Sequence, residues 1–163
     1  MSESELQHTQ FDSVGEYIAK LDELSNLARH SLYIFENNFE DLGFNSEARY
    51  EALRYFLLNN INARLHLLAH DSQPLVRFCP RMIMLLRQFS HKMHIHQTSA
   101  SLRHITEPFA VADQVHFVRR FHFDDIRGIY AKNDPEGAIL LHARFEEMWE
   151  SSHPGASATT LGL

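Results

Sequence analysis

The chain has 163 residues, of which 44% are hydrophobic and 22% charged, and its net charge is −6. This composition predicts a single globular domain and excludes long disordered or fibrous classes. No apolar run approaches the ~20 residues of a membrane-spanning helix, and the polar start MSESELQHTQ lacks the features of a secretory leader. The single cysteine, Cys79, excludes an intramolecular disulfide, so we expect a cytoplasmic protein in which this thiol is buried and inert.

Charge is distributed unevenly along the chain. Residues 1–60 carry 11 acids against 4 basic residues, residues 61–132 carry 5 against 10, and residues 133–163 carry 5 against 1. Eight of the 12 histidines also lie in the basic middle segment. Such a segment can attract phosphate or nucleic acid. We favour the alternative, that acidic and basic segments pair within the fold, because the whole chain is acidic.

The first half of the chain predicts alternating helices and strands. Residues 1–10 are expected to be flexible, and apolar residues then recur at spacings of three and four. Asp12 or Ser13 caps the first helix, and Asn45 caps the second. Proline lacks the backbone N–H of a helix interior, so Pro80 starts a helix afresh. The predicted order is a helix to about 30, strand 31–35, helix 46–60, strand 63–70, helix 80–89 and strand 92–97.

The second half predicts mainly strands. The segments 108–112 and 115–120 read as two strands joined by a tight turn at Asp113–Gln114, and 125–132 reads as another. Asp134–Pro135 starts a closing helix, and residues 153–163 are expected to be a flexible tail. The sequence therefore predicts one α/β domain over 11–152, with a mixed, mainly parallel sheet flanked by helices.

Several segments together resemble one half of the phospholipase D superfamily. The matching pieces are LARHSLYIFEN, ARLHLLAH, KMHIHQ, PFAVADQVHFVRR and the closing helix with FEEMWE. The chain more closely resembles a bacterial domain of this general type that is found beside or fused to acetyltransferase-like proteins. The resemblance implies a phospholipase D-like half, a homodimer that completes the pair of halves, and a candidate acetyltransferase-like protein partner.

The catalytic signature of that superfamily is His-x-Lys, four residues, then Asp. The resemblance implies that the His attacks phosphorus and the Lys neutralises the phosphoryl oxygens. Asp113 occupies the signature Asp position, which puts Pro108 at the Lys position and Thr106 at the His position. Neither residue can perform the role, and HFVRR does not match the family's Gly-Ser-x-Asn element. We therefore expect no catalytic residue and read Asp113 as a hairpin residue.

Two groups of side chains are candidate ligand sites. His66 and His70 share one face of a predicted strand, as do His94 and His96, so four imidazoles would converge if these faces coincide. They would then suit zinc, copper or nickel, although each histidine can equally fill an ordinary polar position. We expect no cofactor. The candidate anion-binding residues are His104, Arg119 and Arg120.

Three functions remain open from the sequence. We favour a non-catalytic phospholipase D-like domain that acts by protein association or by weak anion or phosphate binding. The first alternative is a divergent phosphodiesterase or nuclease that uses His104, or His94 and His96, with Asp113. The second is a nucleic-acid-binding module that uses the basic middle segment.

Overall fold

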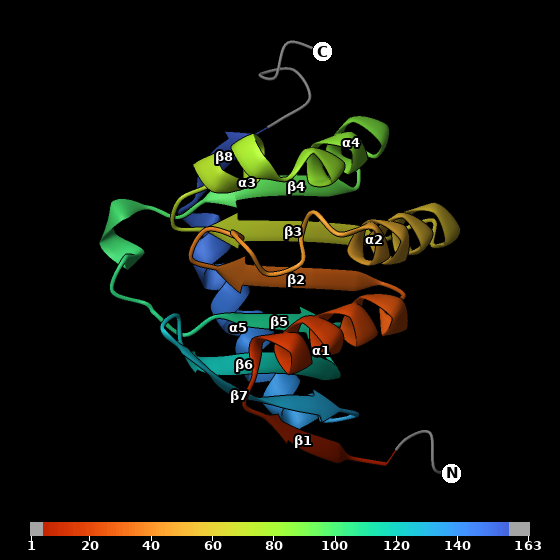
Figure 1. Cartoon of the computed structure of the whole chain (residues 1–163), viewed down its shortest axis with the longest axis vertical. Helices are drawn as coiled ribbons and strands as arrows, with labels where there is room; N and C mark the ends of the chain where they lie inside the picture. Colours follow the sequence, from red (N-terminus) through yellow and green to blue (C-terminus); the bar gives the residue numbers. More distant parts are fainter. Residues whose placement is uncertain (1–4, 157–163) are drawn as a thin grey trace.

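The computed structural model describes residues 5–156, which form one eight-stranded sheet with helices on both faces (Figure 1). Most elements lie where the hydrophobic pattern predicts them. In chain order they are β1 (Gln7–Phe11), α1 (Val14–Leu27), β2 (Ser31–Glu36), α2 (Glu47–Asn59), β3 (Arg64–Ala69), α3 (Gln73–Phe78), α4 (Pro80–Gln88), β4 (Met93–Gln97), the 3-10 turn η2 (Ala100–Leu102), β5 (Phe109–Ala112), β6 (His116–His122), β7 (Asp125–Lys132), α5 (Pro135–Glu150) and β8 (His153–Ala156).

The sheet is mixed, but the expectation that it is mainly parallel was wrong. The strand order is β1-β7-β6-β5-β2-β3-β4-β8, and only the β2–β3 and β3–β4 pairs are parallel. These three strands are joined through helices, which is the connection that parallel neighbours require. The other five pairs are antiparallel, because β5, β6 and β7 follow one another through short turns and both edge strands run against their neighbours.

Both edges of the sheet are formed by short strands that the sequence pattern did not predict. β1 pairs with β7, and β8 pairs with β4. The sequence led us to expect flexible residues in both places, whereas residues 7–10 and 153–156 belong to strands. The outer parts of the predicted flexible segments, 1–4 and 157–163, lie outside the described residues.

Polar side chains fix where the helices begin. Ser13 and Asp134 each accept a hydrogen bond from the backbone N–H three residues ahead, as N-caps do. The second helix is capped by Ser46, which accepts from the Arg49 N–H at 3.1 Å, and not by Asn45 as predicted. The break before Pro80 is confirmed, since α3 ends at Phe78 and α4 begins at Pro80.

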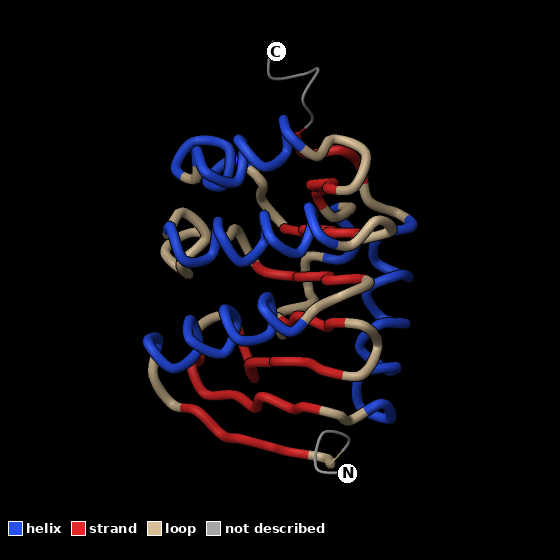
Figure 2. The backbone as a smooth tube through the Cα atoms, turned by 90° about the vertical axis from the view of Figure 1, so that its right-hand side faces the viewer, coloured by secondary structure: helices blue, strands red, loops and turns tan. Residues whose placement is uncertain are grey.

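The two faces of the sheet are covered differently. Helices α1, α2, α3 and α4 lie on one face, whereas α5 alone crosses the strands on the other face (Figures 1 and 2). Each face has its own buried apolar cluster, the larger under α1, α2 and α4 and the smaller under α5. None of the described helices is long and apolar enough to cross a membrane.

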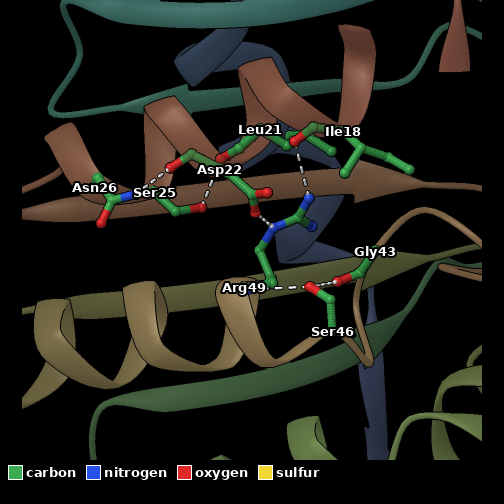
Figure 3. A network of polar contacts seen from close by, with 8 residues as sticks. All are labelled: Ile18, Leu21, Asp22, Ser25, Asn26, Gly43, Ser46 and Arg49. Carbon is green, nitrogen blue, oxygen red and sulfur yellow. Dashed lines mark hydrogen bonds and ion pairs between the residues drawn. The ribbon is translucent and has the colours of Figure 1, made fainter. Parts of the chain in front are cut away.

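A fully buried arginine ties the loop after β2 to the first two helices (Figure 3). Arg49 on α2 donates from Nε to Asp22 Oδ1 at 2.6 Å and from Nη2 to the Ile18 carbonyl at 3.3 Å, both on α1. Its guanidinium also lies 4.5 Å from the centre of the Phe44 ring. This network holds the loop 37–46 against the helices, and that loop forms one wall of the cavity described below.

Candidate functional site

The positions that the resemblance assigns to the catalytic signature are split between the two ends of the sheet. Pro108 precedes β5 at the end where β2 finishes, because Phe109 pairs with Phe35. Thr106 lies two residues earlier, and its carbonyl accepts from the Phe123 N–H. Asp113 lies at the opposite end of β5, beyond the Ala112–Leu32 pair. The geometry therefore does not bring Asp113 together with Thr106 and Pro108.

Asp113 is bound to the backbone where β2 begins. Its carboxylate accepts hydrogen bonds from the N–H groups of Arg29, His30 and Ser31 at 2.7–3.2 Å. Asp113 and Gln114 have φ values of 56° and 59°, which form the tight hairpin turn that the sequence predicted. The side chain thus joins this turn to the loop between α1 and β2.

Replacing Asp113 with alanine should lower the free energy of unfolding by about 2 kcal/mol, because three backbone N–H groups lose a charged acceptor. Asparagine should cost less, since it keeps one acceptor oxygen and tolerates positive φ. Urea denaturation followed by circular dichroism measures both. Equal stability of the alanine variant and the wild type would contradict the role assigned to this carboxylate.

The end of the sheet near Pro108 holds a buried network of three polar side chains. Glu36, at the end of β2, accepts from Arg120 Nη2 at 2.8 Å and from the Tyr17 hydroxyl. Glu36 and Arg120 are 1% and 5% exposed, and Tyr17 is fully buried. Arg120 also donates to the Phe123 carbonyl at 3.1 Å, and its guanidinium lies 4.8 Å from the Tyr17 ring centre.

The electrostatics of this network follow from its burial. Burial raises the pKa of Glu36, and the Arg120 charge and the Tyr17 hydroxyl act against that rise. Burial and the Glu36 charge raise the pKa of Tyr17 well above its ordinary value. Tyr17 therefore keeps its proton and donates it in a hydrogen bond to Glu36. The Arg120 charge is paired with the Glu36 carboxylate inside the protein.

The backbone of Pro108 lies between the two strands that carry the charged members of the network. The Arg120 N–H donates to the Pro108 carbonyl at 3.0 Å on one side, and the adjacent Phe109 pairs with β2 on the other. The fold thus keeps one cation near Pro108, on the neighbouring strand. Glu36 neutralises it there.

An open cavity of about 330 Å³ adjoins the network, lined by Glu36, Arg120, Phe123 and the loop after β2. Glu40 and Asp124 also line it, so its carboxylates outnumber its one arginine. A phosphodiester carries a negative charge, and like charges repel. The cavity is therefore electrostatically unsuited to phosphate.

His70 anchors the segment that leads to Thr106. Its Nε2 lies 2.7 Å from the Ile105 carbonyl, and its Nδ1 lies 2.6 Å from Thr98 Oγ1. A carbonyl can only accept, so Nε2 carries the proton and Nδ1 accepts from the hydroxyl. Burial lowers the pKa of His70. The ring is thus neutral, with both nitrogens engaged in holding the chain.

The three candidate anion-binding residues do not converge. Arg119 and Arg120 lie on opposite faces of β6, so Arg120 faces α1 while Arg119 lines a groove beside α5. His104 is exposed, and its Nδ1 lies 3.0 Å from the Ser101 carbonyl. Of the three, Arg119 keeps a guanidinium for which no ion pair or hydrogen bond is found within residues 5–156.

The four candidate metal-binding histidines share one face of the sheet, but the structure gives them other partners. His66 pairs with His94 across β3 and β4. The rings of His66 and His96 stack on Trp149 of α5, with centroids 4.3 and 3.9 Å apart. In the described part of the chain, no group of three or more histidine, cysteine or acidic residues could hold a metal ion. The metal site proposed from the sequence therefore has no geometric support.

Burial keeps two of these histidines, His66 and His96, neutral. Burial, followed by the neighbouring charges of His94 and His96, lowers the pKa of His66 to about 3. Burial also lowers the pKa of His96 to about 4. Their role in this fold is aromatic packing between α5 and the sheet.

Sequence reasoning missed Tyr17, Glu36 and Trp149 as members of these clusters. Glu36 did leave a signal, because it directly follows the apolar run LYIF in a buried strand and a buried carboxylate needs a partner. Its partner Arg120 lies 84 residues away. The sequence alone does not place β6 near β2.

Comparison with known proteins supports the fold and names a family. Residues 13–161 match the model of a family described as a domain of unknown function, DUF7931. No curated protein matches the chain.

The solved structures that resemble the chain include members of the phospholipase D family. Nuc from Salmonella typhimurium, a phospholipase D family member, has a TM-score of 0.64 and 12% identity over 92% of this chain and 98% of its own. The phosphatidylserine synthase of Haemophilus influenzae Rd KW20 has a TM-score of 0.67 and 10% identity over 93% of this chain and 39% of its own. The chain therefore has the phospholipase D-like fold that the resemblance predicted.

The archaeal chromatin protein TrmBL2, described with a novel mode of DNA binding, has a TM-score of 0.68 and 11% identity over 91% of this chain. This chain spans 54% of the length of TrmBL2. At such identity the likeness concerns the fold alone.

Proposed function

The chain belongs to the DUF7931 family and has a phospholipase D-like fold, and from this premise we propose that it is a non-catalytic domain that acts by binding. One observation carries the proposal. The Glu36–Arg120 pair, with Tyr17, fills the sheet end at which Thr106 and Pro108 stand. Phosphoryl transfer through a histidine needs an imidazole nucleophile and cations free to meet the phosphate, and this arrangement offers an ion pair that is already neutral.

The histidines near this end do not replace the missing nucleophile. His70 is neutral and uses both ring nitrogens to hold the chain. His104 is exposed, but Asp113, which the phosphodiesterase alternative pairs with it, is bound to the start of β2 at the other end of the sheet. The geometry thus favours binding over a divergent phosphodiesterase.

Assays with bis(p-nitrophenyl) phosphate and a single-stranded oligonucleotide test the loss of catalysis. We expect wild-type protein and His104→Ala to release product at the same rate as buffer. Turnover in the wild type that disappears in His104→Ala, or an acid-labile phosphohistidine in the stopped reaction, would overturn the proposal.

Basic residues in the middle segment support binding to protein over binding to nucleic acid. Lys92 donates to the Leu57 and Asn60 carbonyls, and Arg127 pairs with Asp125. Lys92 is thus held against the fold, and the charges of Arg120 and Arg127 are balanced by carboxylates, so less charge remains for a phosphate backbone. Binding to DNA, if it occurs, should weaken steeply with salt.

The proposed partner is a second copy of the chain, and the acetyltransferase-like proteins named by the family resemblance are candidates for a further one. This chain covers 98% of Nuc, so a known protein of this fold consists of a single such domain. Light scattering at micromolar concentration tests the homodimer, for which we expect twice the mass of one chain. A strict monomer would contradict it and leave the non-catalytic proposal intact.

A further inference from the structure

A groove of about 310 Å³ lies beside the first turns of α5, and residues of β6, β7 and β1 line it together with the helix. Its apolar lining is Phe117, Ile129, Leu140 and Leu141, and its polar lining is His8 and Arg119. Leu140 is 72% exposed and its neighbour Ile139 is 53% exposed. A pocket of this size with a mostly apolar lining and few polar groups is typical of small-molecule sites.

The floor of this groove is fixed by close packing of α5 against β6. A Cβ atom at Gly137 would come within 2.7 Å of the Phe117 ring and 2.9 Å of Asp134 Oδ2. Glycine at this position therefore lets the helix approach the strand closely. This close contact sets how near α5 lies to the strand that carries Phe117 and Arg119.

The charges along the groove leave one cation unbalanced. His8 Nε2 lies 2.9 Å from Asp134 Oδ2, and Asp134 Oδ1 accepts from the Gly137 N–H, so both groups are engaged. Arg119, in contrast, has no carboxylate within ion-pair distance in the described part of the chain. A ligand that enters the groove would meet a single guanidinium at its edge.

We propose that this groove binds an amphiphilic carboxylate, a molecule of the fatty-acid class. Its hydrocarbon chain lies along Phe117, Ile129 and Leu140, and its carboxylate pairs with the guanidinium of Arg119. The planar fork of one arginine matches the two oxygens of a carboxylate. The site lies on the face opposite the Glu36–Arg120 network, so the inference does not depend on the loss of catalysis.

Isothermal titration calorimetry with decanoate below its micellar concentration tests this assignment. We expect saturable binding of one decanoate to the wild type. Arg119→Gln should weaken it about tenfold or more, because it removes a charge-assisted hydrogen bond. Leu140→Asp should abolish it by placing a like charge on the groove wall, and 1-decanol, which lacks the charge, should bind about tenfold more weakly.

Arg127→Gln is the matched control, because it removes the same charge from the adjacent strand outside the groove. It should bind decanoate as the wild type does. Circular dichroism checks that each variant is folded. No decanoate binding by the wild type, or equal binding by Arg119→Gln, would overturn the proposal. If Leu140→Asp instead converts a dimer to a monomer and the wild type binds no decanoate, a second copy occupies the groove and the proposal is wrong.

Discussion

Replacing Arg120 with methionine should lower the free energy of unfolding by about 3–5 kcal/mol, because it leaves the Glu36 carboxylate buried without its cation. The methionine keeps much of the apolar stem, so most of the loss reflects charge and hydrogen bonding. Urea denaturation at pH 7, followed by far-UV circular dichroism, measures the change. A loss below about 1 kcal/mol would mean that water or a shifted side chain compensates Glu36.

Two further variants separate charge from packing. Adding Glu36→Gln to Arg120→Met should recover a large part of the loss, since the uncompensated charge is gone. Arg119→Met, at the next position on the other face of the same strand, is the matched control and should change stability by less than about 1 kcal/mol. Equal effects of the two arginine replacements would contradict the assignment.

The Arg120→Met variant should also respond to pH in a defined direction. Burial already raises the pKa of Glu36, and removal of the cation raises it further. A carboxyl group whose folded pKa is raised stabilises the protein at low pH, and that stability is lost as pH rises through the folded pKa. The stability difference from the wild type should therefore grow from acidic to neutral pH.

Acid should destabilise the wild-type protein through the histidines that pack under α5. The pKa of His66 is about 3 and that of His96 about 4 in the folded state, against 6.5 for an ordinary histidine. Between these folded-state pKa values and pH 6.5, the unfolded chain therefore binds protons at these two histidines that the folded chain does not bind. The contribution of these histidines to the free energy of unfolding is complete above pH 6.5. It is lost progressively below pH 6.5, by roughly 1 kcal/mol per pH unit for His66.

Trp149 reports this transition directly, because it is the one tryptophan in the chain and stacks on both rings. Urea midpoints from tryptophan fluorescence should fall from pH 7 to pH 5. His66→Phe keeps an aromatic ring against Trp149 and should reduce the pH dependence, with the remainder due to His96. His104→Ala, at an exposed histidine, should leave it unchanged. A flat wild-type profile would refute the neutral state assigned to these imidazoles.

Local patterns in the sequence predicted most elements of the fold, and the reasons are local. The helix signals act within a few residues: the spacing of apolar residues, the capping side chains and Pro80. The helices α1, α4 and α5 therefore begin where the sequence indicates. The tight turn at Asp113–Gln114 follows from the same short-range preferences. The assignment of Thr106 and Pro108 to the signature positions rests on the resemblance and stays a prediction.

The sheet order and the buried network depend on long-range contacts, and the sequence could not specify them. β1 and β8 are short, and their side chains are largely exposed, so they lack the alternating pattern of a half-buried strand. The Glu36–Arg120 pair forms only because β5 lies between β2 and β6. Likewise, the sequence placed four histidines on one face of the sheet, but only the position of Trp149 explains what they contact.

The outermost strands of the sheet are the first and last strands of the described chain. Seven inter-strand spacings separate them, a distance of roughly 34 Å. The described chain therefore enters the sheet at one rim and leaves it at the opposite rim.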